Sequence, residues 1–213
     1  DDGAAFLGCY SFANHVMAQF KGMGMGIEVP TLKTALEKLL PESTITFMPA
    51  VPVKDFDTSG IAQAKKLVDQ SDLAILVVGD RAGLFGRGTS GEGNDVADLK
   101  LPGAQAEMLD ECLSSSTPGI VVSVSGRPYA LGDFAERAAA MIQAFMPGEE
   151  GGTAIAEVIT GAINPSGRLP VEIPATTWGQ PSTYLQPKYG QPGLGMSPVD
   201  SIPLFSFGHG LTY

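Results

Sequence analysis

The run "LAILVVG" at residues 73–79 decides the fold class, because it is short, apolar and rich in β-branched residues, as buried strands are. Before it lies "SGIAQAKKLVDQS" (59–71), in which apolar residues recur at helical spacing behind the candidate cap Ser59. After it, "PGAQAEMLDECLSSS" (102–116) has the pattern of a helix and "GIVVSVSG" (119–126) that of a second buried strand. A strand, a helix and a strand in this order predict a parallel pair of strands with a helix crossing between them.

The same alternation continues on both sides of this unit. The sequence predicts further helices at 31–41, 131–137 and 151–164, and further strands at 43–50, 138–148 and 167–174. In the helix at 31–41, one face carries the apolar residues Leu32, Ala35, Leu36, Leu39 and Leu40. We therefore expect an α/β fold, with a doubly wound, mostly parallel sheet and helices on both faces, in a single domain spanning 1–213. The tail at 176–213 is rich in Pro, Gly, Tyr and Gln and should form an irregular wrap over the sheet.

The composition excludes several classes of protein. The chain has 213 residues, of which 44% are hydrophobic and 17% charged, as in an ordinary globular protein, and its net charge of −10 argues against a nucleic-acid partner. No apolar run is long enough to span a membrane, and the first residues do not resemble a signal peptide. We expect a cytoplasmic protein, with secretion left open because residues upstream of Asp1 lie outside the sequence. Cys9 and Cys112 are far apart and are expected to be buried thiols rather than a disulfide or a zinc site.

The glycine-rich stretch "GLFGRGTSGEGNDVADLKLPG" (83–103) separates the first strand from the next helix. In an α/β sheet this places it at the carboxyl end of a strand, where ligands of such folds bind. Between Arg81 and Asp98 there are few apolar anchors beyond Leu84, Phe85 and Val96, so we expect this part of the loop to be mobile in the domain by itself. A solvated surface loop without a function is one interpretation of this composition, and a functional loop is the other.

Three kinds of chemistry compete for this loop. "GRGTSG" (86–91) matches the phosphate-binding pattern GxGxxG, but several residues separate it from both the strand and the next helix, and nearby acids would repel a phosphate. A serine hydrolase would need a glycine two residues after Ser90, where Glu92 stands instead. The remaining candidate is Glu92 itself, since a partly desolvated carboxyl group has a raised pKa and can donate a proton near neutral pH. Such a group suits glycoside hydrolysis, in which two carboxyl groups share the work.

A family resemblance rests on four stretches: "SGEGNDVADLKLPGAQ" (90–105), "VVSVSGRP" (121–128), "AFMPGEEGGTAIAEVITGAINPSGRLPVEIP" (144–174) and "FSFGHGLTY" (205–213). In this order they resemble the C-terminal α/β-sandwich domain of glycoside hydrolase family 3, the family of β-glucosidases and β-xylosidases. The resemblance implies a retaining, exo-acting β-glycosidase whose nucleophilic aspartate lies in a preceding (β/α) barrel. It gives Glu92 the role of catalytic acid/base, with substrate contacts from Ser90, Gly91 and Gly93. Residues 94–96 are Asn-Asp-Val, where many relatives have an aromatic residue followed by Asp-Arg.

The resemblance also implies what the whole enzyme contains. A barrel domain would precede this domain and a fibronectin-type module would often follow it. Relatives usually carry a strand just before the position of Asp1, so we expect the sheet to be one strand short. The implied partners are a β-linked glucoside or xyloside oligosaccharide and the barrel domain, with no cofactor and no metal. The choice between glucosides and xylosides stays open, because most of the sugar pocket would lie in the barrel.

Two other functions remain open from the residues alone. A noncatalytic carbohydrate-binding domain or interdomain scaffold would use the loop only to close over a sugar. A nucleotide-binding module would use the glycines of the loop and would show phosphate-dependent binding.

Overall fold

A parallel sheet of three strands forms the centre of the protein, and the computed structural model describes residues 2–20, 22–177 and 202–213. The strands β1 (Ala74–Gly79), β2 (Gly119–Val124) and β3 (Ala140–Gln143) lie in that order across the sheet. Leu76 is in register with Val121, and Val121 with Met141, so these three side chains share one face. The predicted parallel arrangement of these strands is confirmed.

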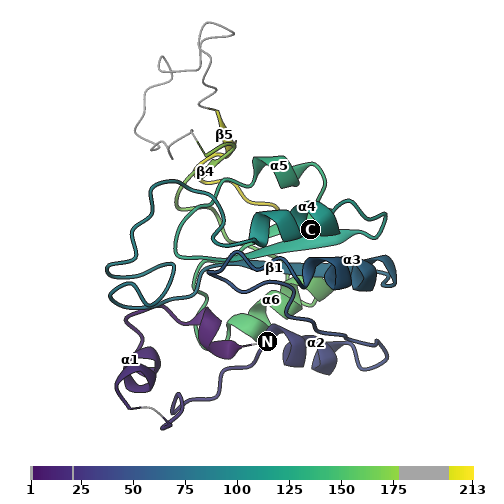
Figure 1. Cartoon of the computed structure of the whole chain (residues 1–213). Coiled ribbons are helices and arrows are strands. Elements are labelled where there is room, and N and C mark those ends of the chain that lie inside the picture. Colours follow the sequence, from purple (N-terminus) through teal and green to yellow (C-terminus); the bar gives the residue numbers. More distant parts are fainter. Residues whose placement is uncertain (1, 21, 178–201) are drawn as a thin grey trace, which may run out of the picture.

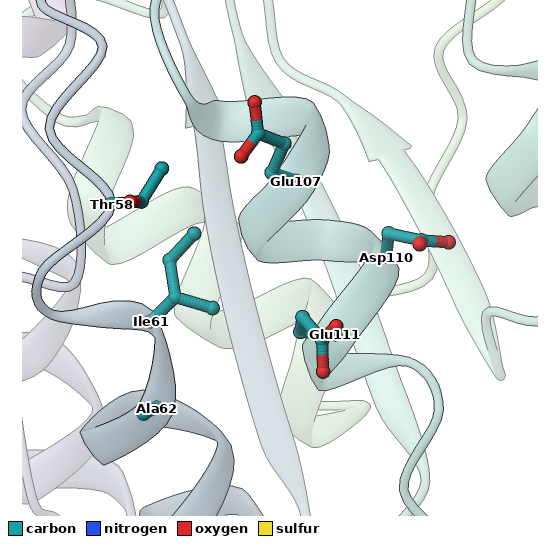
Figure 2. A pocket seen from close by; sticks show the side chains of 6 residues that line it. All are labelled: Thr58, Ile61, Ala62, Glu107, Asp110 and Glu111. Atoms are coloured by element: carbon teal, nitrogen blue, oxygen red, sulfur yellow. The ribbon is translucent and has the colours of Figure 1, made fainter.

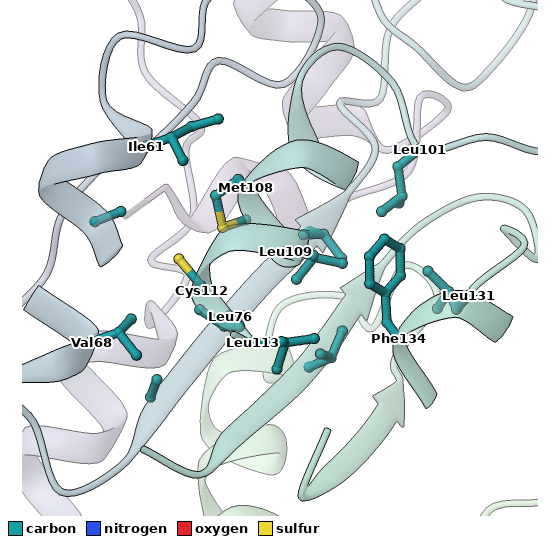
Figure 3. Packing of buried hydrophobic residues seen from close by; sticks show 14 of the residues in the cluster. Ile61, Val68, Leu76, Leu101, Met108, Leu109, Cys112, Leu113, Leu131 and Phe134 are labelled. Atoms are coloured by element: carbon teal, nitrogen blue, oxygen red, sulfur yellow. The ribbon is translucent and has the colours of Figure 1, made fainter. Parts of the chain in front are cut away.

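Helices cover both faces of the sheet, as predicted (Figure 1). On one face, α3 (Ile61–Asp69), α4 (Gln105–Cys112) and the short α5 (Gly132–Ala135) pack against the cluster that contains Leu76 and Val121. On the other face, the 3₁₀ helix η1 (Gly3–Phe6), α2 (Leu32–Leu39) and α6 (Gly151–Thr160) bury Val122 and Val124. Figure 3 shows Leu109 of α4 in the middle of the first cluster, where none of its side chain is exposed. The doubly wound α/β fold is confirmed.

Local hydrogen bonds explain where two of the helices begin. The hydroxyl of Thr31 accepts a hydrogen bond from the backbone of Thr34 and the hydroxyl of Thr34 accepts one from the backbone of Thr31, so α2 starts in a reciprocal capping box. The predicted cap of α3 is wrong, because the N-cap is Gly60 and Ser59 makes no capping bond. The Ser59 amide instead donates to the Asp57 carboxylate, in a turn that ends one residue before the helix.

The strand predicted at 43–50 is not formed in the structure. Ile45 packs against one core cluster and Met48 against the other, so the alternation of apolar residues reflects an extended segment that contacts both layers. The strand β1 is paired only with β2 among the described strands, and Val77 of β1 is 48% exposed. Side chains of a parallel sheet are normally covered, so the face of β1 at Val77 lacks the cover that is usual in such sheets. The missing strand stays a prediction.

The remaining elements are short. The predicted strand at 167–174 is reduced to β4 (Ile173–Pro174), which pairs antiparallel with β5 (Pro203–Phe205). The expectation of an irregular tail is therefore wrong at β5, and residues 178–201 lie outside the described part of the chain. The helix α1 (Phe12–Gln19) follows η1, and Cys9 and Tyr10 lie just before its first residue. No described helix has the length and apolar content needed to cross a membrane.

Candidate active site

The glycine loop leaves the sheet at the carboxyl end of β1, where the sequence places it. The amide of Asp80, the first residue after β1, donates to the carbonyl of Val124 at the end of β2 (2.8 Å). The Asp80 carboxylate in turn accepts a hydrogen bond from the amide of Gly126 (2.8 Å). The start of the loop is thus attached to the chain that leaves the neighbouring strand.

The loop folds back on itself around the side chain of Asn94. The Asn94 amide group donates to the carbonyls of Gly83 (2.9 Å) and Glu92 (3.0 Å), and its oxygen accepts from the amide of Gly88 (3.0 Å). Backbone bonds from Phe85 to Glu92 and from Gly83 to Ser90 close the same fold. Phe85 adopts a left-handed backbone conformation with a φ of 52°, which costs energy for a residue other than glycine and is frequent at functional sites.

A buried polar cluster lies beneath the loop and was not predicted from the sequence. Asp80 is 4% exposed and accepts hydrogen bonds from the hydroxyls of Thr89 and Tyr129. Burial and this bond to Asp80 raise the pKa of Tyr129, so the phenol stays neutral in the folded protein. Arg127 completes the cluster with an ion pair to Asp80 at 3.7 Å. The sequence does contain a signal for this cluster. An acid, Asp80, comes directly after one predicted buried strand, and Arg127 and Tyr129 come shortly after the next predicted strand.

Glu92 projects from this loop with an exposed side chain. Its carboxylate accepts a hydrogen bond from the hydroxyl of Tyr10, whose ring stacks on His15 with 5.9 Å between the ring centroids. A Cβ atom added at Gly91 would lie 2.9 Å from the Cys9 sulfur, so the N-terminal segment packs directly against the loop. Tyr10 was not predicted as a site residue. Cys9 was expected to be buried but is only partly buried, whereas Cys112 is buried as predicted.

The other predicted site residues shape the loop. Ser90 is 8% exposed and lies against Gly126, where an added Cβ would come within 2.1 Å of the Ser90 hydroxyl oxygen. Gly91 and Gly93 have φ angles of 112° and 71°, which side chains rarely adopt. A substrate contact from these three residues stays a prediction. The mobility of the loop in the domain by itself stays a prediction.

The nucleotide-binding interpretation of the loop finds little support in the geometry. After the GxGxxG pattern at 86–91 the next helix, α4, begins only at Gln105, so no helix N-terminus follows the glycines. A hollow of about 400 Å³ lies between the start of α3 and α4 (Figure 2), and its lining includes no residue of the glycine loop. It is lined by Thr58, Ile61, Ala62, Glu107, Asp110 and Glu111. Within residues 2–20, 22–177 and 202–213, no group of three or more His, Cys, Asp or Glu residues is placed to hold a metal ion.

Comparison with known proteins identifies relatives along nearly the whole chain. The sequence profile described as "Glycosyl hydrolase family 3 C-terminal domain" matches residues 2–213. A β-xylosidase of Formosa agariphila is 34% identical over 79% of the chain and 23% of its own length. A lysosomal β-glucosidase of Dictyostelium discoideum is 34% identical over 73% of the chain and 17% of its own length.

A solved structure shares the fold as well. A β-glucosidase from Listeria innocua in complex with glucose superposes with a TM-score of 0.65 at 25% identity, over 76% of this chain and 23% of that protein. The chain thus spans about a fifth of the length of the curated relatives named above.

Proposed function

Because the chain belongs to the glycosyl hydrolase family 3 C-terminal domain family, we propose that it is the acid/base-carrying domain of a retaining, exo-acting β-glycosidase. The substrates are β-linked glucosides or xylosides, in keeping with relatives described as a β-xylosidase and a β-glucosidase. The partner is a barrel domain of the same protein, which supplies the nucleophilic aspartate. The observation that carries the proposal is the exposed carboxylate of Glu92, presented on a folded loop at the carboxyl end of β1.

The mechanism is a double displacement. As the barrel aspartate attacks the anomeric carbon, Glu92 donates its proton to the glycosidic oxygen, and the bond between that carbon and oxygen breaks. Glu92, now ionised, then takes a proton from a water molecule that attacks the anomeric carbon and releases the sugar from the aspartate. No metal or organic cofactor takes part in either step.

The exposure of Glu92 explains why this chain would need the barrel. A general acid works best where water is excluded, and in this chain the Glu92 side chain faces solvent. A barrel docked over the loop would cover the carboxyl group and bring the second carboxylate close to it, about 5–5.5 Å away in retaining enzymes. The chain alone is therefore expected not to hydrolyse aryl β-glucosides or aryl β-xylosides. Steady turnover by the purified chain would contradict the division of labour between the two domains.

The test of Glu92 uses the intact enzyme and the variant Glu92→Gln. Glutamine keeps the shape of the side chain but can neither donate nor accept the proton that the reaction transfers. Loss of a positioned general acid or base typically costs about 10²–10⁴-fold in rate. Unactivated alkyl or sugar leaving groups need the proton, so their first step should slow. Activated aryl groups leave without it, so they should show a burst followed by slow turnover. Azide should restore turnover of the activated substrates, because it attacks the intermediate without needing a base.

Asp95→Asn is the matched control, since Asp95 is an exposed acid three residues along the same loop. It should show neither the burst nor the rescue by azide. If Glu92→Gln slows activated and unactivated substrates equally and azide has no effect, the acid/base role belongs to another carboxylate. If Glu92→Gln leaves the kinetics unchanged, the loop has the noncatalytic role of closing over a sugar.

A further inference from the structure

Arg127 holds the segment that carries Glu92 by its backbone. One terminal nitrogen of its guanidinium, Nη1, donates to the carbonyl of Thr89 at 2.6 Å, and the other, Nη2, donates to the carbonyl of Asn94 at 2.9 Å. These two carbonyls lie on either side of Glu92 along the chain. A planar guanidinium offers its donors in a fixed fork, so it sets the separation of both carbonyls at once.

The guanidinium of Arg127 is itself held in place by Tyr129 and Asp80. Nη1 also donates to the hydroxyl of Tyr129 at 3.2 Å and lies 3.7 Å from the carboxylate of Asp80, whose side chain is fully buried. The hydroxyl of Thr89 donates to the same carboxylate at 2.7 Å. Thr89 is therefore held through both its carbonyl and its side chain, by groups anchored at the ends of β1 and β2.

Apolar packing does not replace these bonds at the tip of the loop. Phe85 is 72% exposed and Val96 is 49% exposed, so neither side chain is buried in the core. The geometry points to Arg127 as a positioning residue for Glu92, an inference that rests on the acid/base role proposed above. Without the fork, Thr89 and Asn94 would be held only by the hydrogen bonds within the loop and to Asp80, and Arg127 would no longer set the separation of their carbonyls. A misplacement of about 1 Å in a catalytic group can cost on the order of 10²-fold in rate.

The test compares Arg127→Met and Arg127→Lys in the intact enzyme. Arg127→Met should lower kcat on substrates with alkyl or sugar leaving groups by roughly 10²-fold. Formation of the glycosyl-enzyme from activated aryl substrates should change much less, because that step does not need the proton of Glu92. Arg127→Lys keeps the charge but not the fork, so it should give a smaller loss with the same dependence on the leaving group.

Arg137→Met is the matched control. Arg137 also forms an ion pair, with Asp110 at 2.5 Å, and donates to the carbonyl of the same residue, so these bonds go to α4 and not to the loop. Its replacement should leave the dependence on the leaving group unchanged. If Arg127→Met folds poorly, Arg127→Lys and thermal melting of each variant separate a loss of folded enzyme from a loss of positioning.

A double-mutant cycle distinguishes failure of this inference from failure of the proposed function. If Arg127 acts through Glu92, Arg127→Met should cost little further activity once Glu92→Gln is present, so the two losses are not additive. Additive losses, or equal losses on all leaving groups, would show that Arg127 only supports the fold and would overturn the inference. Absence of azide rescue in Glu92→Gln alone would instead overturn the assignment of Glu92 on which it rests.

Discussion

The hydroxyl of Tyr10 donates a hydrogen bond to the carboxylate of Glu92, although 82 positions separate the two residues in the sequence. This bond is the main cause that raises the pKa of Tyr10 above its ordinary value of 10.0, and a loss of hydration and the charge of Glu92 act in the same direction. The titration of Tyr10 is therefore a probe of where Glu92 lies.

Glu92→Gln should lower the pKa of Tyr10 back toward its ordinary value, because the charged acceptor is lost. The measurement is an NMR titration of the tyrosine ring carbons, with Tyr10→Phe to assign the signal. Asp95→Asn should leave the titration unchanged. An unaltered Tyr10 pKa in Glu92→Gln would mean that the two side chains are not in contact in solution.

Gly91→Ala should destabilise the protein more than Gly86→Ala. Both glycines have positive φ angles, which cost other residues about 1–2 kcal/mol. At Gly91, an added Cβ would also lie 2.3 Å from the carbonyl oxygen of Gly83 and 2.7 Å from the Cβ of Cys9, whereas at Gly86 it would meet nothing within 4 Å. Urea denaturation of the two variants measures the difference. Equal midpoints would contradict the close packing of the N-terminal segment on the loop.

Tyr129 should make stability depend on pH in the alkaline range. Because its folded pKa is raised above 10.0, its contribution is fully present below about pH 10 and is lost at higher pH, where the phenol ionises in the unfolded chain first. Tyr129→Phe should be less stable near neutral pH by about 1–2 kcal/mol, through the lost bond to Asp80. It should also lose less stability than the wild type as the pH rises above 10, measured by denaturant unfolding at each pH. Parallel curves for both proteins would refute this coupling.

Leu109→Ala should cost about 2–5 kcal/mol of unfolding free energy, because Leu109 is completely buried and its removal leaves a cavity between α4 and the sheet. Leu39→Ala makes the same chemical change in α2 at a side chain that is 36% exposed. It should cost less than about 1 kcal/mol. Similar losses for the two variants would place Leu109 outside the core.

Periodicity in the sequence predicted the buried faces of helices, because these depend on the spacing of nearby residues. The spacing of Leu32 and Leu36 predicted one buried face of α2, and both residues are buried in the structure. It also placed Leu39 on that face, but Leu39 stands at the end of the helix and is partly exposed. The strand predicted at 43–50 failed for a related reason, since alternation reports contact with two layers and not hydrogen bonding to a neighbouring strand.

The sequence predicted the part of the site that lies within one local motif, but not the contacts that distant segments make with it. Glycines around Glu92 indicated a loop, and its place after β1 followed from the alternation of elements. The contacts of Tyr10 and Arg127 could not be predicted, because they join distant segments and Arg127 binds carbonyl groups that every residue type carries. Such contacts produce no recognisable pattern in the amino-acid sequence of the loop.

The binding of Arg127 to backbone carbonyls affects how this loop can change during evolution. Since the guanidinium contacts the main chain of Thr89 and Asn94, it places no demand on the side chains at exposed positions such as Arg87 and Asp95. Substitutions at those two positions can accumulate without moving the frame on which Glu92 stands. A library that randomises them would therefore explore new leaving-group preferences from one fixed catalytic geometry.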